Sequence, residues 1–237
     1  GTHTELTERG ISFQFSGIAL TCLFDPHADR MRFVAGPLQN SRSGDALNRE
    51  LLAANRIATR DARFGAANGE LYTAFLHPLS MLTELQCLRG MTCCASLLAN
   101  SEIHQRYESD EPTATPQEQW NVEPGTTTAS DLQAWMQDRG GIVQPEDGSL
   151  LLGIEKTRLT GRCLQGNSFV IESAVHSSAS SDNMSHMLDA SFHSALDPRY
   201  AIAEDNPRIV FHHALSEMSP ELLDSIMRQV HLATISY

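Results

Sequence analysis

The alternation of apolar and polar residues in the first third of the chain predicts a small antiparallel sheet with helices packed on it. Ile11, Phe13 and Phe15 alternate with polar residues, as in a strand with one buried face. Turn residues at 25–29 separate two more alternating runs. Asn68-Gly69 is a dipeptide typical of a tight hairpin. The predicted order is strands at 11–15, 18–24 and 31–35, a helix after Asp45, strands at 63–66 and 71–76, and a long helix from residue 81.

The last part of the chain shows the same pattern, preceded by one additional helix. Thr128 and Asp131 have the spacing of a capping box, and Gly140-Gly141 is expected to end that helix. Ser219 followed by Pro220 is typical of the start of a final helix. The predicted order is a helix at 128–139, strands at 150–154, 158–164 and 168–175, a helix from 181, strands at 200–203 and 208–213, and a helix from 219.

The two patterns are related by a constant shift of 136 positions, which predicts a duplicated domain. A repeat of this length that occurs only twice is too long for a solenoid unit. The match begins near Gly17 and extends to Ser80. Matching pairs include Gly17 and Gly153, Phe33 and Phe169, Asp61 and Asp197, Phe75 and Phe211, and His77 and His213.

We therefore expect two α+β units, each with a five-stranded, largely antiparallel sheet, joined as an intramolecular pseudo-dimer with a pseudo-twofold axis. The first unit spans residues 1–108, and its leading helix is apparently missing. The second unit spans residues 126–237. Proline and acidic residues dominate the segment between them, residues 109–125, which predicts a solvated linker.

Composition narrows the expected partners. The formal net charge is −12 and Lys156 is the only lysine, which argues against nucleic acid or an anionic membrane as a partner. No apolar run is long enough to predict a transmembrane helix. The five cysteines lack metal-like C-x-x-C spacing, which favours a reducing, cytoplasmic location.

Two histidines and two cysteines are of residue types used in catalysis or metal binding, but the sequence favours a role without chemistry for each pair. His77 and His213 occupy equivalent positions and could meet in a pseudo-dimer, but a structural or exposed pair is the favoured interpretation. Cys93 and Cys94 lie in an apolar helix without a basic neighbourhood, so we expect buried small side chains. No hydrolase, nucleotide-binding or metalloprotease motif occurs. We expect no enzyme activity, catalytic residue, cofactor or metal.

The remaining candidates are apolar side chains that could contact another protein. Flexible methionine-rich faces suit variable partners. The alternative is that these residues form only the seam between helix and sheet, and part of the face is expected to join the two units. Tryptophan in the linker is expected to dock on a neighbouring surface. The candidate interface residues are Leu47, Leu51, Met184, Met187, Leu188 and Trp120.

The order helix, three strands, helix, two strands, helix in an acidic unit resembles the class I type III secretion chaperones, the CesT-like family. In the first unit the likeness lies in residues 18–24, the Asp25-Pro26 turn, residues 31–38, the run from Leu47 to Asn55, and Asn68 to Leu71. In the second unit, Ser130 to Gly141 and Asp147 to Leu150 look more like the related YbjN-like domains.

The resemblance implies a non-enzymatic protein that shelters a segment of a secreted effector before export. Members of the family are usually single-domain homodimers, whereas this chain carries two units. The alternative that the resemblance leaves open is a YbjN-like regulatory or stress-response module that binds a folded signalling partner.

Overall fold

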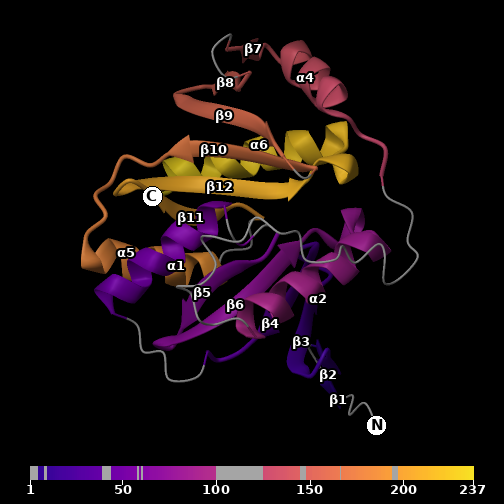
Figure 1. Ribbon diagram of the computed structural model, residues 1–237, viewed down its shortest axis with the longest axis vertical. Coiled ribbons are helices and arrows are strands. Elements are labelled where there is room, and N and C mark those ends of the chain that lie inside the picture. The colour runs from indigo at the N-terminus through magenta and orange to yellow at the C-terminus, as the bar shows by residue number, and fades with distance from the viewer. Residues whose placement is uncertain are drawn as a thin grey trace.

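The computed structural model describes residues 5–7, 10–38, 44–57, 59, 61–99, 125–144, 148–165, 167–193 and 197–237. The fold is α+β, with two antiparallel sheets and helices packed on them (Figure 1). We call residues 5–99 the first half and residues 125–237 the second half. All but the last residue of the predicted linker lies outside the described residues. No helix among the described residues is both long and apolar enough to cross a bilayer.

Among its described residues, the first half contains one sheet and two α-helices. The strand order across the sheet is β1-β2-β3-β4-β6-β5, and every neighbouring pair is antiparallel. The elements are β1 (Glu5–Thr7), β2 (Gly10–Phe15), β3 (Ile18–Asp25), β4 (Arg30–Ala35), α1 (Asp45–Ile57), β5 (Arg63–Ala67), β6 (Glu70–His77), the 3-10 turn η1 (Leu79–Met81) and α2 (Glu84–Ala99).

The second half repeats this order and adds a helix at its start. The strand order is β11-β12-β10-β9-β8-β7, again antiparallel throughout. The elements are α4 (Ala129–Asp138), β7 (Ile142–Val143), β8 (Leu150–Ile154), β9 (Thr157–Leu164), β10 (Ser168–Ala174), α5 (Ser181–His193), β11 (Arg199–Ala203), β12 (Asn206–Ala214), the 3-10 turn η3 (Leu215–Glu217) and α6 (Pro220–Ile235).

Local sequence chemistry explains where these elements begin and end. The capping box predicted at Thr128 is confirmed, because its side chain and that of Asp131 each accept a hydrogen bond from the other's backbone N–H. Ser219 caps α6 with Pro220 in the first turn, as predicted. The hairpin at Asn68-Gly69 is also confirmed, with φ of 53° and 78° at the two residues.

Three sequence expectations need correction. Each sheet has six strands rather than five, because the short β1 and β7 extend the outer edges. The helix expected from residue 81 begins at Glu84, after η1. The turn expected at 205–207 lies one position earlier, where Glu204 and Asp205 have φ of 48° and 65°.

The shift of 136 positions holds for the second part of each half and changes in the first part. The pairs α1 and α5, β5 and β11, β6 and β12, and α2 and α6 begin 136 positions apart. In the first sheet Phe33 pairs with Phe75, whereas Phe211 pairs with Ile171. The position equivalent to Phe33 is therefore Ile171, and the predicted match with Phe169 is wrong by two residues. Duplication as the origin of this likeness stays a prediction.

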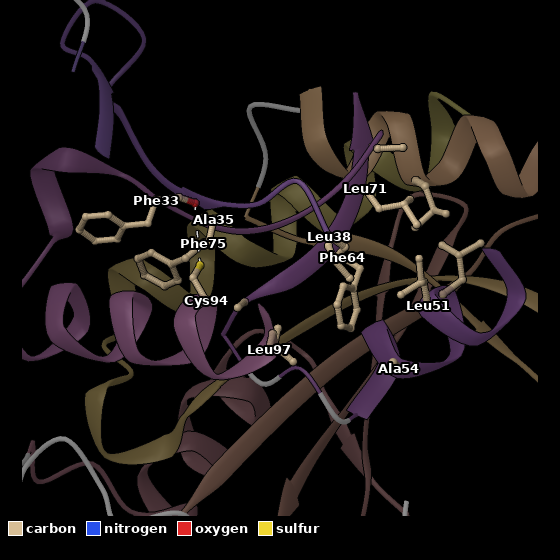
Figure 2. Packing of buried hydrophobic residues seen from close by; sticks show 14 of the residues in the cluster. Phe33, Ala35, Leu38, Leu51, Ala54, Phe64, Leu71, Phe75, Cys94 and Leu97 are labelled. Atoms are coloured by element: carbon tan, nitrogen blue, oxygen red, sulfur yellow. Dashed lines mark hydrogen bonds between the residues drawn. The ribbon is translucent and has the colours of Figure 1, made fainter. Parts of the chain in front are cut away.

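Each half has an apolar core between its sheet and its last helix. In the first half α2 packs on the face of the sheet that carries Phe33 and Phe75. Figure 2 shows Cys94 pointing from α2 toward the backbone of the strand that carries Phe33, and its thiol lies 3.9 Å from the carbonyl oxygen of Phe33. Burial raises the pKa of Cys94 well above its usual value. This thiol is thus a neutral, apolar part of the core, as expected from the sequence. Cys93, which was also expected to be buried, is only partly buried.

Candidate functional site

The residues expected to face another protein lie at the contact between the two halves. Leu51, Met187 and Leu188 are completely buried, and Met184 is 2% exposed. Leu47 packs against the same cluster and is partly buried. Trp120 lies outside the described residues. Four of the five described side chains are thus covered within the chain and Leu47 is covered in part, and their contact with a separate partner stays a prediction.

The two halves exchange their middle helices. Helix α5 of the second half packs on β5 of the first, and α1 of the first half packs on β11 of the second. Figure 1 shows α1 and α5 side by side between the two sheets. Gly65 permits this approach, because a Cβ there would lie only 2.8–3.0 Å from atoms of Phe192, two of which belong to the backbone. Apolar packing of each half therefore depends on a helix from the other.

Polar groups cross the same contact in a reciprocal way. Arg63 donates to the carbonyl oxygens of Asp197 and Pro198, and the equivalent Arg199 donates to the carbonyl oxygen of Asn55. Both guanidinium groups are buried, which lowers the pKa of Arg63 to about 9 and that of Arg199 to about 10. Backbone carbonyl acceptors offset part of the cost of burying these cations.

A cluster of charged side chains lies at the junction of β12, α2 and the loop before β5. The Nδ1 atom of His213 is 2.5 Å from a carboxylate oxygen of Asp61, and both residues are buried. Arg89 pairs with Glu217 at 2.5 Å and lies 3.9 Å from Asp61. Although burial opposes charge, His213 and Arg89 hold the pKa of Asp61 well below its usual value, and Asp61 raises the pKa of His213. The Asp61–His213 pair therefore links the halves, and both shifts favour its charged form.

The equivalent positions on the other side of the contact behave differently. Asp197 accepts a hydrogen bond from Gln229 at 3.0 Å and lies 3.6 Å from Arg30. Burial raises the pKa of Asp197 and lowers the pKa of His77. The rings of His77 and His213 are 6.1 Å apart, so the equivalent histidines do meet. The described residues contain no group of three potential ligands that could hold a metal ion.

A cleft of about 620 Å³ opens beside the turn between β3 and β4. Arg30 and Arg32 line it together with apolar side chains, on the face of the sheet opposite α2. Arg30 is paired with Asp197, and the guanidinium of Arg32 lies over the ring of Phe192 at 5.3 Å. Both cations are thus engaged within the chain. The sequence offered only the alternation of Arg30 and Arg32 as a signal for this cleft.

The two sheets differ in how far their helix-bearing faces are covered. In the second half α4 lies beside α6, and its Leu132 and Met136 are completely buried in the second core. Leu150 and Leu152 of β8 lie in this core and are 4% and 5% exposed. The first half has no corresponding helix among its described residues. Its partly exposed apolar side chains here are Ile11, Phe13, Cys22, Cys87 and Met91, which we call the open face.

Comparisons with known proteins give only distant likenesses. No family model matches the sequence, and no curated protein matches it. A chain in the structure of the HopA1-SchA chaperone-effector complex is 11% identical, with a TM-score of 0.38, and the match covers 45% of this chain and 91% of that chain. The di-domain ARO/CYC StfQ from the steffimycin biosynthetic pathway is 8% identical, with a TM-score of 0.15, and the match covers 99% of this chain and 84% of that chain. At these scores neither likeness supports a functional argument.

Proposed function

We propose that this protein binds other proteins without catalysis and shelters a segment of a client, in the manner of the type III secretion chaperones that its sequence resembles. The supporting observation is the open face of the first half. Its apolar side chains remain partly exposed, whereas a helix buries their counterparts in the second half. Contiguous apolar surface on a soluble protein is typical of a binding site.

The contact between the halves supports the same proposal in a different way. The exchange of helices buries the apolar faces of α1 and α5, including Met184 and Met187 of α5, so these faces stabilise the scaffold. A rigid scaffold lowers the entropy cost of binding, because the open face is already formed before the client arrives. In this proposal α1 and α5 hold the shape of the molecule, and the open face contacts the client.

The net charge favours a client segment that is neutral or basic. The chain carries a formal charge of −12, and complementary charge accelerates association and disfavours acidic competitors. A secreted client bound in the cytoplasm before export would satisfy this condition if its segment is rich in lysine or arginine. Cytoplasmic location is part of the proposal.

The test is co-expression with N-terminal segments of secreted proteins encoded beside its gene. A chaperone should form a stable complex with such a segment and protect it from limited proteolysis, while a scrambled segment of equal composition stays unprotected. The alternative, a YbjN-like regulatory module, should ignore all these segments and bind a folded partner. Failure of every segment to bind would contradict the chaperone proposal.

A further inference from the structure

The strand pairings give an exact correspondence between the open face and the covered face of the second half. From β6 outward, the first sheet pairs Phe75 with Phe33, Phe33 with Cys22, and Cys22 with Ile11. From β12 outward, the second sheet pairs Phe211 with Ile171, Ile171 with Gly161, and Gly161 with Leu150.

Four positions of the open face thus have known counterparts under α4. Ile11 corresponds to Leu150, and Cys22 to Gly161. Phe13 pairs with Leu20 and Leu152 pairs with Leu159, so Phe13 corresponds to Leu152. On the helix, Met91 corresponds to Met227, which is 5% exposed.

The second half shows how a helix occupies this place. Leu132 and Met136, four residues apart, present one apolar stripe to β8 and α6. The end carbon of Met136 lies 3.4 Å from the point where a Cβ on Gly161 would be. Arg139 then pairs with Asp224 of α6 through two hydrogen bonds and fixes the end of α4.

We propose that the open face of the first half binds an amphipathic helix of a partner protein, seated as α4 is seated in the second half. This inference rests on the proposed function and specifies the chemistry of the client. The bound helix carries two apolar side chains four residues apart, one over Phe13 and one over Cys22. Recognition by an apolar stripe in a groove is a common mode of peptide binding.

The difference between Cys22 and Gly161 sets a preference for the second apolar side chain. Gly161 leaves room for the end of Met136, whereas the corresponding Cys22 adds a Cβ and a sulfur atom at the equivalent position of the first half. Burial raises the pKa of Cys22 to about 11, so its thiol is neutral and compatible with an apolar neighbour. A helix with valine or alanine at this position should therefore fit the first half better than one with methionine.

The experiment uses a fluorescent peptide with the sequence of residues 126–141 and the change Met136→Val, titrated with the 237-residue protein and followed by anisotropy. We expect saturable binding, and weaker binding of the peptide that retains Met136. A peptide with Leu132→Asp should lose affinity by roughly tenfold or more, because a carboxylate would be placed against the apolar open face. The tethered α4 of the second half holds its own site at a high effective concentration and excludes the peptide there.

Variants of the protein locate the binding site. Phe13→Asp and Met91→Glu, on two different elements, should each weaken peptide binding by roughly tenfold or more. Gln14→Asp is the matched control, because Gln14 is exposed and adjacent to Phe13 but points to the other face of β2. Thermal unfolding confirms that each variant is folded. Unchanged peptide affinity in folded Phe13→Asp and Met91→Glu would overturn the proposal.

Two other occupants of the open face would give different results. A second copy of the chain would give a dimer in light scattering that Phe13→Asp dissociates. A segment of a longer form of the protein that precedes residue 1 would prevent the peptide from binding to that form. Either result, or no peptide binding, overturns a partner helix as the occupant.

Failure of the inference is separable from failure of the proposed function. If a client segment binds the wild type, Phe13→Asp and Met91→Glu equally well, the protein is a chaperone that uses another surface. If the peptide binds to the open face but no client segment does, the helix-binding site is supported and the chaperone function is contradicted.

Discussion

The charged pair between the halves allows a quantitative prediction for Asp61→Asn. Asp61 is buried and its carboxylate lies 2.5 Å from the Nδ1 atom of His213. An asparagine keeps the shape but removes the charge that His213 and Arg89 face. Removal of one partner from a buried ion pair costs about 3–5 kcal/mol. Because the amide oxygen can still accept a hydrogen bond, we expect a loss of about 3 kcal/mol in the free energy of unfolding at pH 6.

The pH dependence of this loss follows from the directions of the two pKa shifts. The lowered pKa of Asp61 stabilises the fold above the unfolded value of about 3.9, and this contribution disappears as pH falls through the folded pKa. The raised pKa of His213 stabilises the fold below about 6.5, and this contribution disappears as pH rises through the folded pKa. The cost of Asp61→Asn should therefore be greatest between pH 4 and 6.5, approximately, and smaller on either side.

Asp197→Asn is the matched control, because Asp197 occupies the equivalent position. Burial raises its pKa, so the charged form of Asp197 is disfavoured in the folded state. The wild type should gain stability relative to Asp197→Asn as pH falls through the raised folded pKa toward about 3.9. We expect a cost of about 1 kcal/mol for Asp197→Asn at pH 6, typical of one altered hydrogen bond.

Urea unfolding of the wild type and both variants at several pH values between 3.5 and 8 measures these differences, with roughly equal m-values required for comparison. Equal costs for the two substitutions, or the same pH trend in both, would refute the assignment of a charged Asp61–His213 pair. A cost below about 1 kcal/mol for Asp61→Asn at pH 6 would do the same.

Three further predictions concern packing, capping and a second ion pair. Gly65→Ala should lower the free energy of unfolding by about 1–3 kcal/mol, because its Cβ would press on the backbone of Phe192, while Gly153→Ala in open space is the control in urea unfolding; equal effects would contradict this contact. Thr128→Ala should cost about 1 kcal/mol and speed amide exchange in α4 but not in α6, and unchanged exchange would argue against the capping box. Glu172→Gln should cost about 2 kcal/mol in thermal unfolding at pH 7, because Glu172 accepts hydrogen bonds from Arg56 and Arg162; no change would mean that the contact adds nothing.

The sequence was most informative where local chemistry decides the structure. The capping box at Thr128, the hairpin at Asn68-Gly69 and the proline after Ser219 all have a short-range cause, and the structure has each of them. The shift of 136 positions located the equivalent helices, since their lengths are equal. It was wrong at Phe33 because the chain from Phe33 to the start of α1 is two residues longer than the chain from Ile171 to the start of α5, which a fixed offset cannot represent.

The exchange of helices was harder to foresee. The pattern of Met184 and Leu188 shows that one face of the helix is apolar, but it does not say which sheet covers that face. The close approach of Gly65 to Phe192 and the pairing of Asp61 with His213 join residues more than 100 positions apart. Such contacts depend on how the halves are placed, and local periodicity carries no information about that placement.

The open face was foreseeable in outline. The comparison of the two patterns placed a helix at 128–139 with no equivalent in the first unit. Its residues could be matched to those under α4 only from the observed strand pairing, which makes Cys22 equivalent to Gly161 and Phe13 equivalent to Leu152. Only then does the partly exposed state of Phe13 become informative, since its counterpart is buried under α4.

Hydrogen exchange of the whole protein, with and without the peptide of residues 126–141 carrying Met136→Val, tests most directly whether a partner docks on the first half. Bound peptide should slow amide exchange in β2 (Gly10–Phe15) and α2 (Glu84–Ala99), with β8 (Leu150–Ile154) and α6 (Pro220–Ile235) unchanged. Slower exchange confined to the second half, or no change at a saturating peptide concentration, would contradict the account.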